Sequence, residues 1–143
     1  VDAVPVVWNE PSIDWSTYES IVVRSTWDYH LHVQAFRDWI DRIDESPVKI
    51  WNPAGLLRMS IDKSYLVDLA RAGFATVPSI FVSPDEPAEI EDLFSDLGCS
   101  EAVVKPTVAA SGFRVRRVER GNRLEASNQY RELLSYGNVM VQP

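Results

Sequence analysis

A lysine at the end of an apolar run is the first residue of this sequence that suggests chemistry. Lys105 directly follows Ala102, Val103 and Val104, which have the pattern of an interior β-strand. An unpaired ammonium group is costly to bury. Either the side chain reaches solvent along its aliphatic stem, or an anion such as a phosphate compensates its charge. The residues alone leave both interpretations open.

The loop after Lys105 consists of small residues and lies between two predicted strands, 102–106 and 114–118. Residues 107–112 could bring backbone N–H groups, and the hydroxyls of Thr107 and Ser111, close to phosphate oxygens. The alternative is an ordinary flexible hairpin loop. Because Gly112 is its one glycine and it lacks the Walker A pattern, the loop by itself is weak evidence for a phosphate site.

A second lysine, Lys63, follows Asp62 in the first turn of a predicted helix over 61–71. The helix dipole favours anions at that end, so it does not explain a cation there. A bound anion would explain it. The alternative is a solvated surface lysine, which is the commoner situation for an isolated helical lysine.

A polar segment, residues 24–30, follows the carboxyl end of a predicted strand, where α/β sheets commonly bind ligands. Arg24 could bind a substrate carboxylate through two hydrogen bonds, and Asp28 could receive an amine. The alternative is an internal ion pair between Arg24 and Asp28, with Trp27 in the core. The pattern favours this alternative slightly.

Two other residue types suggest no site. His30 and His32 have no cysteine or further histidine at ligand spacing, so solvated loop histidines are expected rather than a metal site. Cys99 has no obvious activating base beside it and follows a helix-ending glycine, which predicts an inert thiol. We therefore assign no metal ligand and no catalytic nucleophile.

The bulk composition limits the partners of the chain. A formal net charge of -7 opposes the phosphate backbone, so nucleic acid is not expected as a partner. A single cysteine cannot form an internal disulfide, and no apolar stretch reaches the roughly 20 residues that cross a bilayer. With no signal-like N-terminus, the expected location is the cytoplasm, without a membrane partner.

Apolar runs and helix-period segments alternate along the chain, which predicts an α/β fold with a parallel sheet in at least the first part. The expected strands cover 4–8, 20–23, 48–51, 77–82, 102–106, 114–118 and 139–143. The expected helices lie at 33–43, around 56–57, at 61–71 with Ser60 as its N-cap, at about 85–97 and at 126–135. The chain begins without methionine and ends in what resembles a buried strand, so we expect the natural protein to extend beyond both ends.

In combination, these segments resemble the ATP-grasp ligases, in particular the glutathione-synthetase-like branch and its relatives that form cycloserine. The similarity covers nearly the whole chain, and its most specific parts are residues 22–29 and the pair Lys105-Pro106. Asn52-Pro53 and the triplet 61–63 resemble two further motifs of the branch. Residues 139–143 resemble the strand that enters the adenine hinge.

The resemblance implies an ATP-grasp-like fold, in which residues 1–53 form the pre-ATP-grasp lobe and residues 54–143 the small ATP-binding lobe. It also implies roles for individual residues, with the phosphate-binding loop poorer in glycine than is usual. The expected ATP-binding residues are Lys63 and Lys105 at the phosphates, Thr107, Ser111 and Gly112 in the closing loop, and Gln142 at the adenine edge. The expected substrate-binding residues are Arg24, Ser25 and Asp28.

The resemblance further implies ATP and Mg²⁺ as cofactors, an amino-acid-like small molecule as substrate and a possible homo-oligomer. The magnesium ligands and the arginine that assists phosphoryl transfer follow the hinge in this family, so this chain alone is expected to be inactive. The hypothesis is an ATP-dependent carboxylate-amine ligase that acts through an acyl phosphate. The alternative is a non-catalytic nucleotide-binding protein with the same fold.

Overall fold

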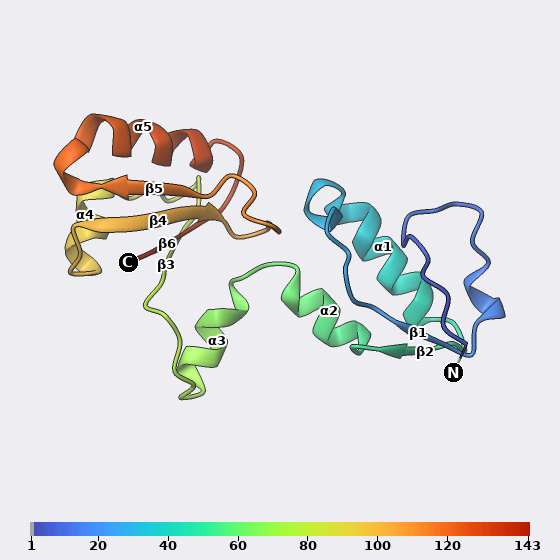
Figure 1. Cartoon of the computed structure of the whole chain (residues 1–143). Helices are drawn as coiled ribbons and strands as arrows, with labels where there is room; N and C mark the ends of the chain where they lie inside the picture. The colour runs from blue at the N-terminus through green and yellow to red at the C-terminus, as the bar shows by residue number, and fades with distance from the viewer. Residues whose placement is uncertain (1) are drawn as a thin grey trace. The chain divides into compact units, whose positions relative to one another are not determined.

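The computed structural model describes residues 2–143, which fall into two compact units, one ending at Ile61 and one beginning at Asp62 (Figure 1). The boundary expected from the sequence, after residue 53, lies ahead of helix α2 (Ala54–Ser60). This helix belongs to the first unit because Leu57 is buried there, and because Arg58 pairs with Asp41 and Asp44 on the preceding helix at 2.7 and 2.8 Å.

The first unit pairs two parallel strands with helices. Its elements in chain order are η1 (Trp15–Thr17), β1 (Ser20–Val22), η2 (Tyr29–Leu31), α1 (Val33–Asp44), β2 (Lys49–Trp51) and α2. Strand β1 pairs with β2 in parallel, with Ile21 opposite Ile50. A parallel pair needs a crossover connection, and α1 lies in that connection. The predicted parallel arrangement of this part is confirmed.

Helix α1 forms because its apolar residues recur every three or four positions, so that they share one face. Phe36, Trp39, Ile40 and Ile43 are all buried. The rings of Phe36 and Trp39 stack at 5.6 Å, and Trp8 meets Phe36 edge-on at 5.0 Å. The core of this unit is therefore largely aromatic.

The predicted strand at 4–8 is wrong. Residues 2–7 form no regular element, and Val4 and Val7 are 68% and 61% exposed. A strand requires a neighbour to take its backbone hydrogen bonds, and no described strand pairs with this segment. Trp8 alone reaches the core, where its indole is 7% exposed.

The second unit is a four-stranded antiparallel sheet with helices. Its elements in chain order are α3 (Tyr65–Arg71), β3 (Ile80–Val82), α4 (Ile90–Asp96), β4 (Glu101–Pro106), β5 (Arg116–Glu119), η3 (Arg120–Asn122), α5 (Arg123–Leu134) and β6 (Val139–Gln142). The strand order is β3-β6-β4-β5, with antiparallel pairs throughout. The mixed α/β class expected from the sequence, a parallel part followed by an α+β part, is confirmed.

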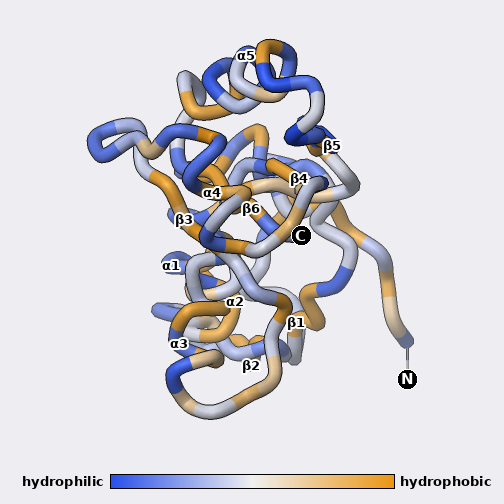
Figure 2. The backbone as a smooth tube through the Cα atoms, turned by 90° about the vertical axis from the view of Figure 1, so that its left-hand side faces the viewer, coloured by the Kyte–Doolittle hydropathy of each residue, from blue (hydrophilic) through white to orange (hydrophobic). Residues whose placement is uncertain are grey.

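Strand β6 lies between β3 and β4, as its apolar run of residues 139–141 predicted. Val139 and Val141 are fully buried, and Met140 is 1% exposed. Both neighbours are earlier segments of the same chain, so these two pairings alone account for the apolar pattern of β6. Figure 2 shows the apolar stretches along β3, β4 and β6.

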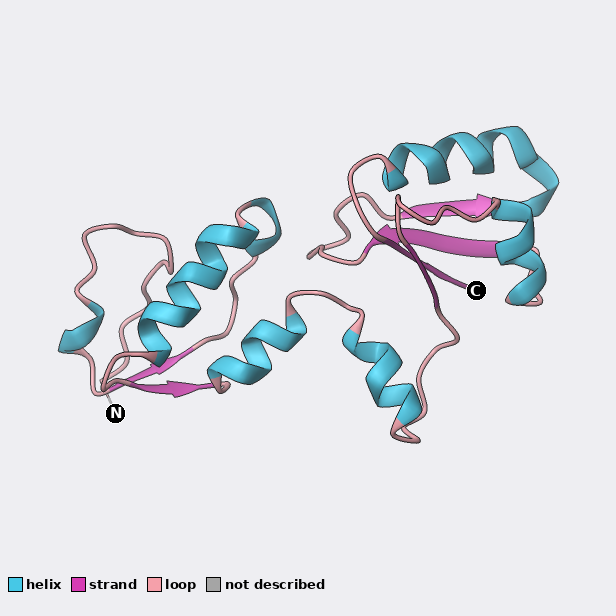
Figure 3. Ribbon diagram, turned by 180° about the vertical axis from the view of Figure 1, so that it is seen from behind, coloured by secondary structure: helices cyan, strands magenta, loops and turns pink. Residues whose placement is uncertain are grey.

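Helices α4 and α5 cover one face of this sheet, as the view from behind also shows (Figure 3). The core cluster joins Leu93 and Phe94 of α4 and Tyr130 of α5 to Val104 of β4 and Val141 of β6. Successive residues of a strand point to opposite faces. Residues of β4 and β6 that alternate with the core residues therefore point away from these helices.

The predicted helix over 61–71 begins later than expected, at Tyr65. Ser60 is not its N-cap but the last residue of α2, and its hydroxyl donates to the carbonyl of Leu57 at 3.0 Å. This change matters for the site, because residues 61–64 form a turn between two helices and Lys63 lies in it.

Replacement of Gly98 by alanine is expected to lower the free energy of unfolding by about 1–2 kcal/mol, because Gly98 ends α4 with φ +63°, a conformation that costs a residue with a Cβ about that much. No atom lies within 4 Å of an added Cβ, so the backbone conformation alone decides. Gly121→Ala is the control, since its added Cβ is equally open and its φ is not left-handed. Equal urea midpoints for the two variants would contradict the expectation.

Candidate functional site

Lys105 lies near the end of β4 on the face that points away from α4 and α5. Val104, its neighbour, is fully buried in the core on the other face, and strand alternation places Lys105 opposite to it. Its register partner is Met140 of β6, so an apolar side chain lies beside the lysine stem. The lysine is half-buried, which combines a charge with partial desolvation.

Gln142 shares this face of the sheet. It lies two residues after Met140 in β6 and pairs with Val103, which lies two residues before Lys105 in β4. Its side-chain amide donates to the Ser79 hydroxyl at 2.7 Å. The face therefore has a half-buried ammonium towards one end, an amide towards the other, and apolar side chains between them.

Lys63 reaches the loop after β4. Its ammonium donates to the backbone carbonyl of Ala109 at 2.6 Å and to that of Thr107 at 3.3 Å. Burial lowers the pKa of Lys63 below its ordinary value, repulsion from the Lys105 ammonium lowers it further, and attraction to Asp62 partly opposes both. Two lysines 42 positions apart in the chain are thus near enough to repel one another.

Thr107 connects three segments of the second unit. Its hydroxyl donates to Asp62 Oδ2 at 2.9 Å, its backbone N–H donates to the carbonyl of Asn138 at 3.0 Å, and its own carbonyl accepts from the Lys63 N–H at 3.0 Å. The residue is 3% exposed. Its hydroxyl is therefore engaged within the protein rather than turned outward.

The loop itself uses left-handed backbone conformations. Ser111, Gly112 and Arg114 have φ of 51°, 74° and 52°, and two of these three residues carry a Cβ. The N–H of Phe113 donates to the carbonyl of Ala110 at 2.9 Å, which closes a turn. The predicted hairpin between β4 and β5 is confirmed, and its loop has a defined backbone.

In the first unit, Arg24 lines a cavity of about 320 Å³. Asn52 shapes one wall, with a left-handed φ of 60° and a side-chain amide that donates to the carbonyl of Val23 at 2.8 Å. Polar and apolar side chains share the lining. The residues that line it are Val23, Arg24, Thr26, Tyr29, Phe36, Asn52, Leu56, Leu57, Ser60 and Ile61.

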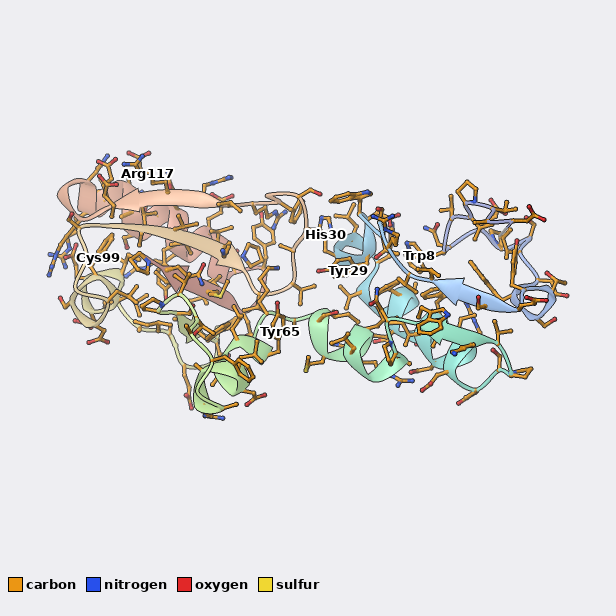
Figure 4. All side chains as sticks on the ribbon, turned by 60° about the horizontal axis from the view of Figure 1, so that its bottom comes forward. Trp8, Tyr29, His30, Tyr65, Cys99 and Arg117 are labelled. Carbon is orange, nitrogen blue, oxygen red and sulfur yellow. The ribbon has the colours of Figure 1, made fainter. Side chains whose placement is uncertain are left out.

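Ser25 and Asp28, which the sequence grouped with Arg24, do not line this cavity. Asp28 Oδ1 accepts a hydrogen bond from the Trp8 indole at 2.8 Å, so the carboxylate helps to attach the N-terminal segment. Figure 4 shows Trp8, Tyr29 and His30 in this unit. Sequence reasoning missed Thr26 and Tyr29 as lining residues, although both stood within the polar segment that it singled out.

The sequence assigned no site to His30, His32 or Cys99. Among residues 2–143, no group of three or more His, Cys, Asp or Glu side chains could hold a metal ion. Cys99 packs partly buried against the core of the second unit. In the same described residues, no helix has the length and apolar character that a membrane span requires.

Comparison with known proteins gives one family match and one curated relative. Residues 1–52 match the family described as the N-terminal domain of D-cycloserine synthetase DcsG. The chain is 33% identical over 140 residues to the cycloserine biosynthesis protein DcsG of Streptomyces lavendulae, covering 95% of this chain and 46% of the relative. The chain therefore spans about half the length of the curated relative that it matches.

Solved structures agree on the fold. The crystal structure of D-cycloserine synthetase DcsG superposes with a TM-score of 0.82 at 30% identity, over 95% of this chain and 47% of that one. The ATP-grasp ligase PsnB, complexed with a precursor variant, Mg and ADP, superposes with a TM-score of 0.51 at 21% identity, over 87% and 44%. The second likeness shows the fold alone.

Proposed function

On the premise that this chain is a homologue of D-cycloserine synthetase and has the fold of the matching half of ATP-grasp ligases, we propose that it is part of an ATP-dependent carboxylate-amine ligase. The observation that carries the proposal is that the Lys63 ammonium donates to the carbonyls of Thr107 and Ala109, so that it contacts the loop that directly follows Lys105. Like charges brought together by a fold are destabilising, and the Asp62 carboxylate offsets this only in part for Lys63. A bound triphosphate supplies further negative charge.

The nucleotide would lie on the face of the sheet that carries Lys105, Met140 and Gln142. Gln142 suits the polar edge of a base, and the two ammonium groups suit the phosphates. Ser111 and Gly112 lie in the loop that Lys63 contacts through Ala109, which supports a role for them near the phosphates. Thr107 is buried and its hydroxyl bonds to Asp62, so it supports the loop without contacting the nucleotide.

The proposed reaction has two steps. A substrate carboxylate oxygen forms a bond to the γ-phosphorus of ATP, the bond between that phosphorus and the β–γ bridging oxygen breaks, and ADP leaves. An amine then attacks the acyl carbon, inorganic phosphate leaves, and the amine nitrogen loses a proton to give the amide. The lysine charges stabilise the negative charge on the transferring phosphoryl group. No side-chain nucleophile is required.

Mg²⁺ remains part of the proposal, since it neutralises phosphate charge in phosphoryl transfer. The described residues offer no set of ligands that fits it, so we assign none of them to the metal and derive no step from it. We propose that its ligands, and with them the full ligation activity, belong to the half of the relatives' length that this chain does not span. A cytoplasmic location is also part of the proposal.

Two measurements on the full-length enzyme test this function. Calorimetry with ATP and Mg²⁺ measures nucleotide binding, and ADP release in the presence of amino-acid derivatives measures ligation. ADP release that depends on an amino-acid derivative supports the ligase. Tight ATP binding without such turnover would favour a nucleotide-binding protein, and absence of ATP binding would contradict both functions.

On the substrate side, we propose that Arg24 binds a carboxylate in the 320 Å³ cavity, since it supplies the only cationic side chain of the described lining. Arg24→Ala is expected to raise the KM for the amino-acid substrate about 10- to 100-fold, because charged hydrogen bonds contribute about 1.5–3 kcal/mol. The KM for ATP should stay unchanged. Steady-state kinetics with each substrate varied in turn separates the two constants.

Asp28→Asn is the matched variant for Arg24→Ala, because the amide oxygen can still accept from the Trp8 indole. A role of Asp28 in binding the substrate amine predicts a raised KM for that substrate, whereas a role in attaching the N-terminal segment predicts kinetics near wild type. If Arg24→Ala changed neither KM, the carboxylate assignment would fail.

A further inference from the structure

The buried hydroxyl of Thr107 lies in the segment that joins Lys105 to its loop, and it forms a hydrogen bond to the turn that carries Lys63. Among the described residues, Thr107 is the polar residue that is buried, at 3% exposure. A buried hydroxyl must form hydrogen bonds, because an unsatisfied one costs free energy. Its donor goes to Asp62, 45 positions earlier in the chain. The strand end that precedes the loop is thus attached to the turn that carries Lys63.

Asp62 is held at both of its carboxylate oxygens. Oδ2 accepts from the Thr107 hydroxyl at 2.9 Å, and Oδ1 accepts from the Ser64 backbone N–H at 2.8 Å. The second bond fixes the aspartate within the turn before α3, so its position relative to Lys63 is defined. The Lys63 N–H adds a main-chain bond to the Thr107 carbonyl at 3.0 Å. The two segments therefore meet in a fixed register.

With the two segments held in this way, two backbone carbonyl oxygens point towards the Lys63 ammonium. The oxygens of Thr107 and Ala109 lie 3.3 and 2.6 Å from Nζ. An ammonium carries three N–H donors, and these carbonyls accept two. The third can meet a ligand anion without any loss of the contacts to the loop. Lys63 is thus oriented before a phosphate arrives, which reduces the conformational entropy lost on binding.

We propose that Asp62 and Thr107 form a positioning pair, which fixes the Lys63 ammonium and the first residues of the phosphate loop in the arrangement that receives the nucleotide. The proposal deepens the proposed function and rests on it for the identity of the ligand. Neither residue touches the nucleotide in this role. Asp62 acts through Thr107 and Lys63, and its charge also counters the repulsion between the lysines.

The charges around Lys63 give the pair a measurable signature. Burial and the Lys105 ammonium on β4 lower the pKa of Lys63, and the Asp62 carboxylate beside it raises that pKa. Asp62→Asn keeps an oxygen that can accept from Thr107 but removes the negative charge, so it lowers the pKa of Lys63 further. Thr107→Val removes the hydrogen bond and keeps the charge. The two variants thus separate geometry from electrostatics.

The first experiment uses the full-length enzyme and steady-state kinetics with ATP varied. Thr107→Val, which conserves the shape, is expected to raise the KM for ATP about 10-fold, because a hydrogen bond to a charged group is lost. Thr107→Ser keeps the hydroxyl and is expected to stay within about 2-fold of wild type. In a double-mutant cycle, Asp62→Ala and Thr107→Val together should cost no more than the larger single change. Equal KM values for the serine and valine variants, or additive effects, would overturn the pair.

The second experiment needs no nucleotide, so it decides the proposal even if the ligase function fails. This chain contains the lysines Lys49, Lys63 and Lys105, and in the ¹³C-lysine-labelled full-length enzyme arginine substitution at position 63 assigns the Lys63 Cε signal. The Lys63 signal is expected to titrate below the ordinary pKa of a lysine side chain, and at still lower pH in Asp62→Asn. A Lys63 signal that titrates at the ordinary pKa of a lysine side chain, or that is unmoved by Asp62→Asn, would overturn the arrangement.

Discussion

Lys105→Ala in the full-length enzyme is expected to lower kcat/KM for ATP by about 100- to 1,000-fold, the range seen when one preorganised charge-stabilising group is removed from an active site. The expectation follows from the position of the lysine on the face opposite the core and beside Met140. A cation in this half-buried position interacts with phosphate more strongly than an exposed lysine does, because water screens it less. ADP release at varied ATP concentrations measures the effect.

Lys49→Ala is the matched control, because Lys49 is exposed and its ammonium lies 4.2 Å from the centre of the Trp51 ring in the first unit. It removes the same charge from the chain and should leave ATP turnover near wild type. Lys105→Arg should retain part of the activity, since it preserves the charge but changes the donor geometry. Turnover unaffected by Lys105→Ala would remove Lys105 from the nucleotide site and most of the support for the ligase.

Phe94→Ala is expected to lower the free energy of unfolding of the second unit by about 3–5 kcal/mol, the usual cost of deleting a buried aromatic ring. Phe94 is fully buried between the helices and the sheet. Leu124→Ala is the control in the same unit, because Leu124 is 75% exposed and should change the stability by less than about 0.5 kcal/mol. Similar urea midpoints for the two variants would contradict the described core.

The choice of probe matters for this measurement. All five tryptophans, at positions 8, 15, 27, 39 and 51, lie in the first unit. Tryptophan fluorescence therefore reports the unfolding of that unit, and far-UV circular dichroism is needed to follow the sheet of the second. Phe94→Ala should shift the dichroism transition.

The elements that the sequence predicted well are those whose signals are local. Helix α1 followed from apolar spacing, the end of α4 from Gly98, and the interior position of β6 from its apolar run. Two predictions failed because the deciding interaction was not local. Residues 4–8 have strand composition but no described strand to pair with, and Ser60, a good cap by type, continues the preceding helix.

For the candidate site, the sequence supplied residue types but not their contacts. The proximity of Lys63 to Lys105 depends on the antiparallel sheet and on the turn before α3, and neither register can be derived from spacing along the chain. The resemblance grouped Arg24 with Ser25 and Asp28, whereas only Arg24 of the three lines the cavity. The bond between Asp62 and Thr107 spans 45 positions and had no sequence signal.

The central position of β6 in the sheet also determines when the second unit can fold during synthesis of the chain. Strands β3 and β4 are both hydrogen-bonded to β6, which is the last of the three to be synthesised. While residues 139–142 are still inside the ribosomal exit tunnel, β3 has no partner and its edge is exposed to other nascent chains. The sheet is therefore completed only after residues 139–142 have left the exit tunnel, and until then β3 and β4 lack the strand that joins them.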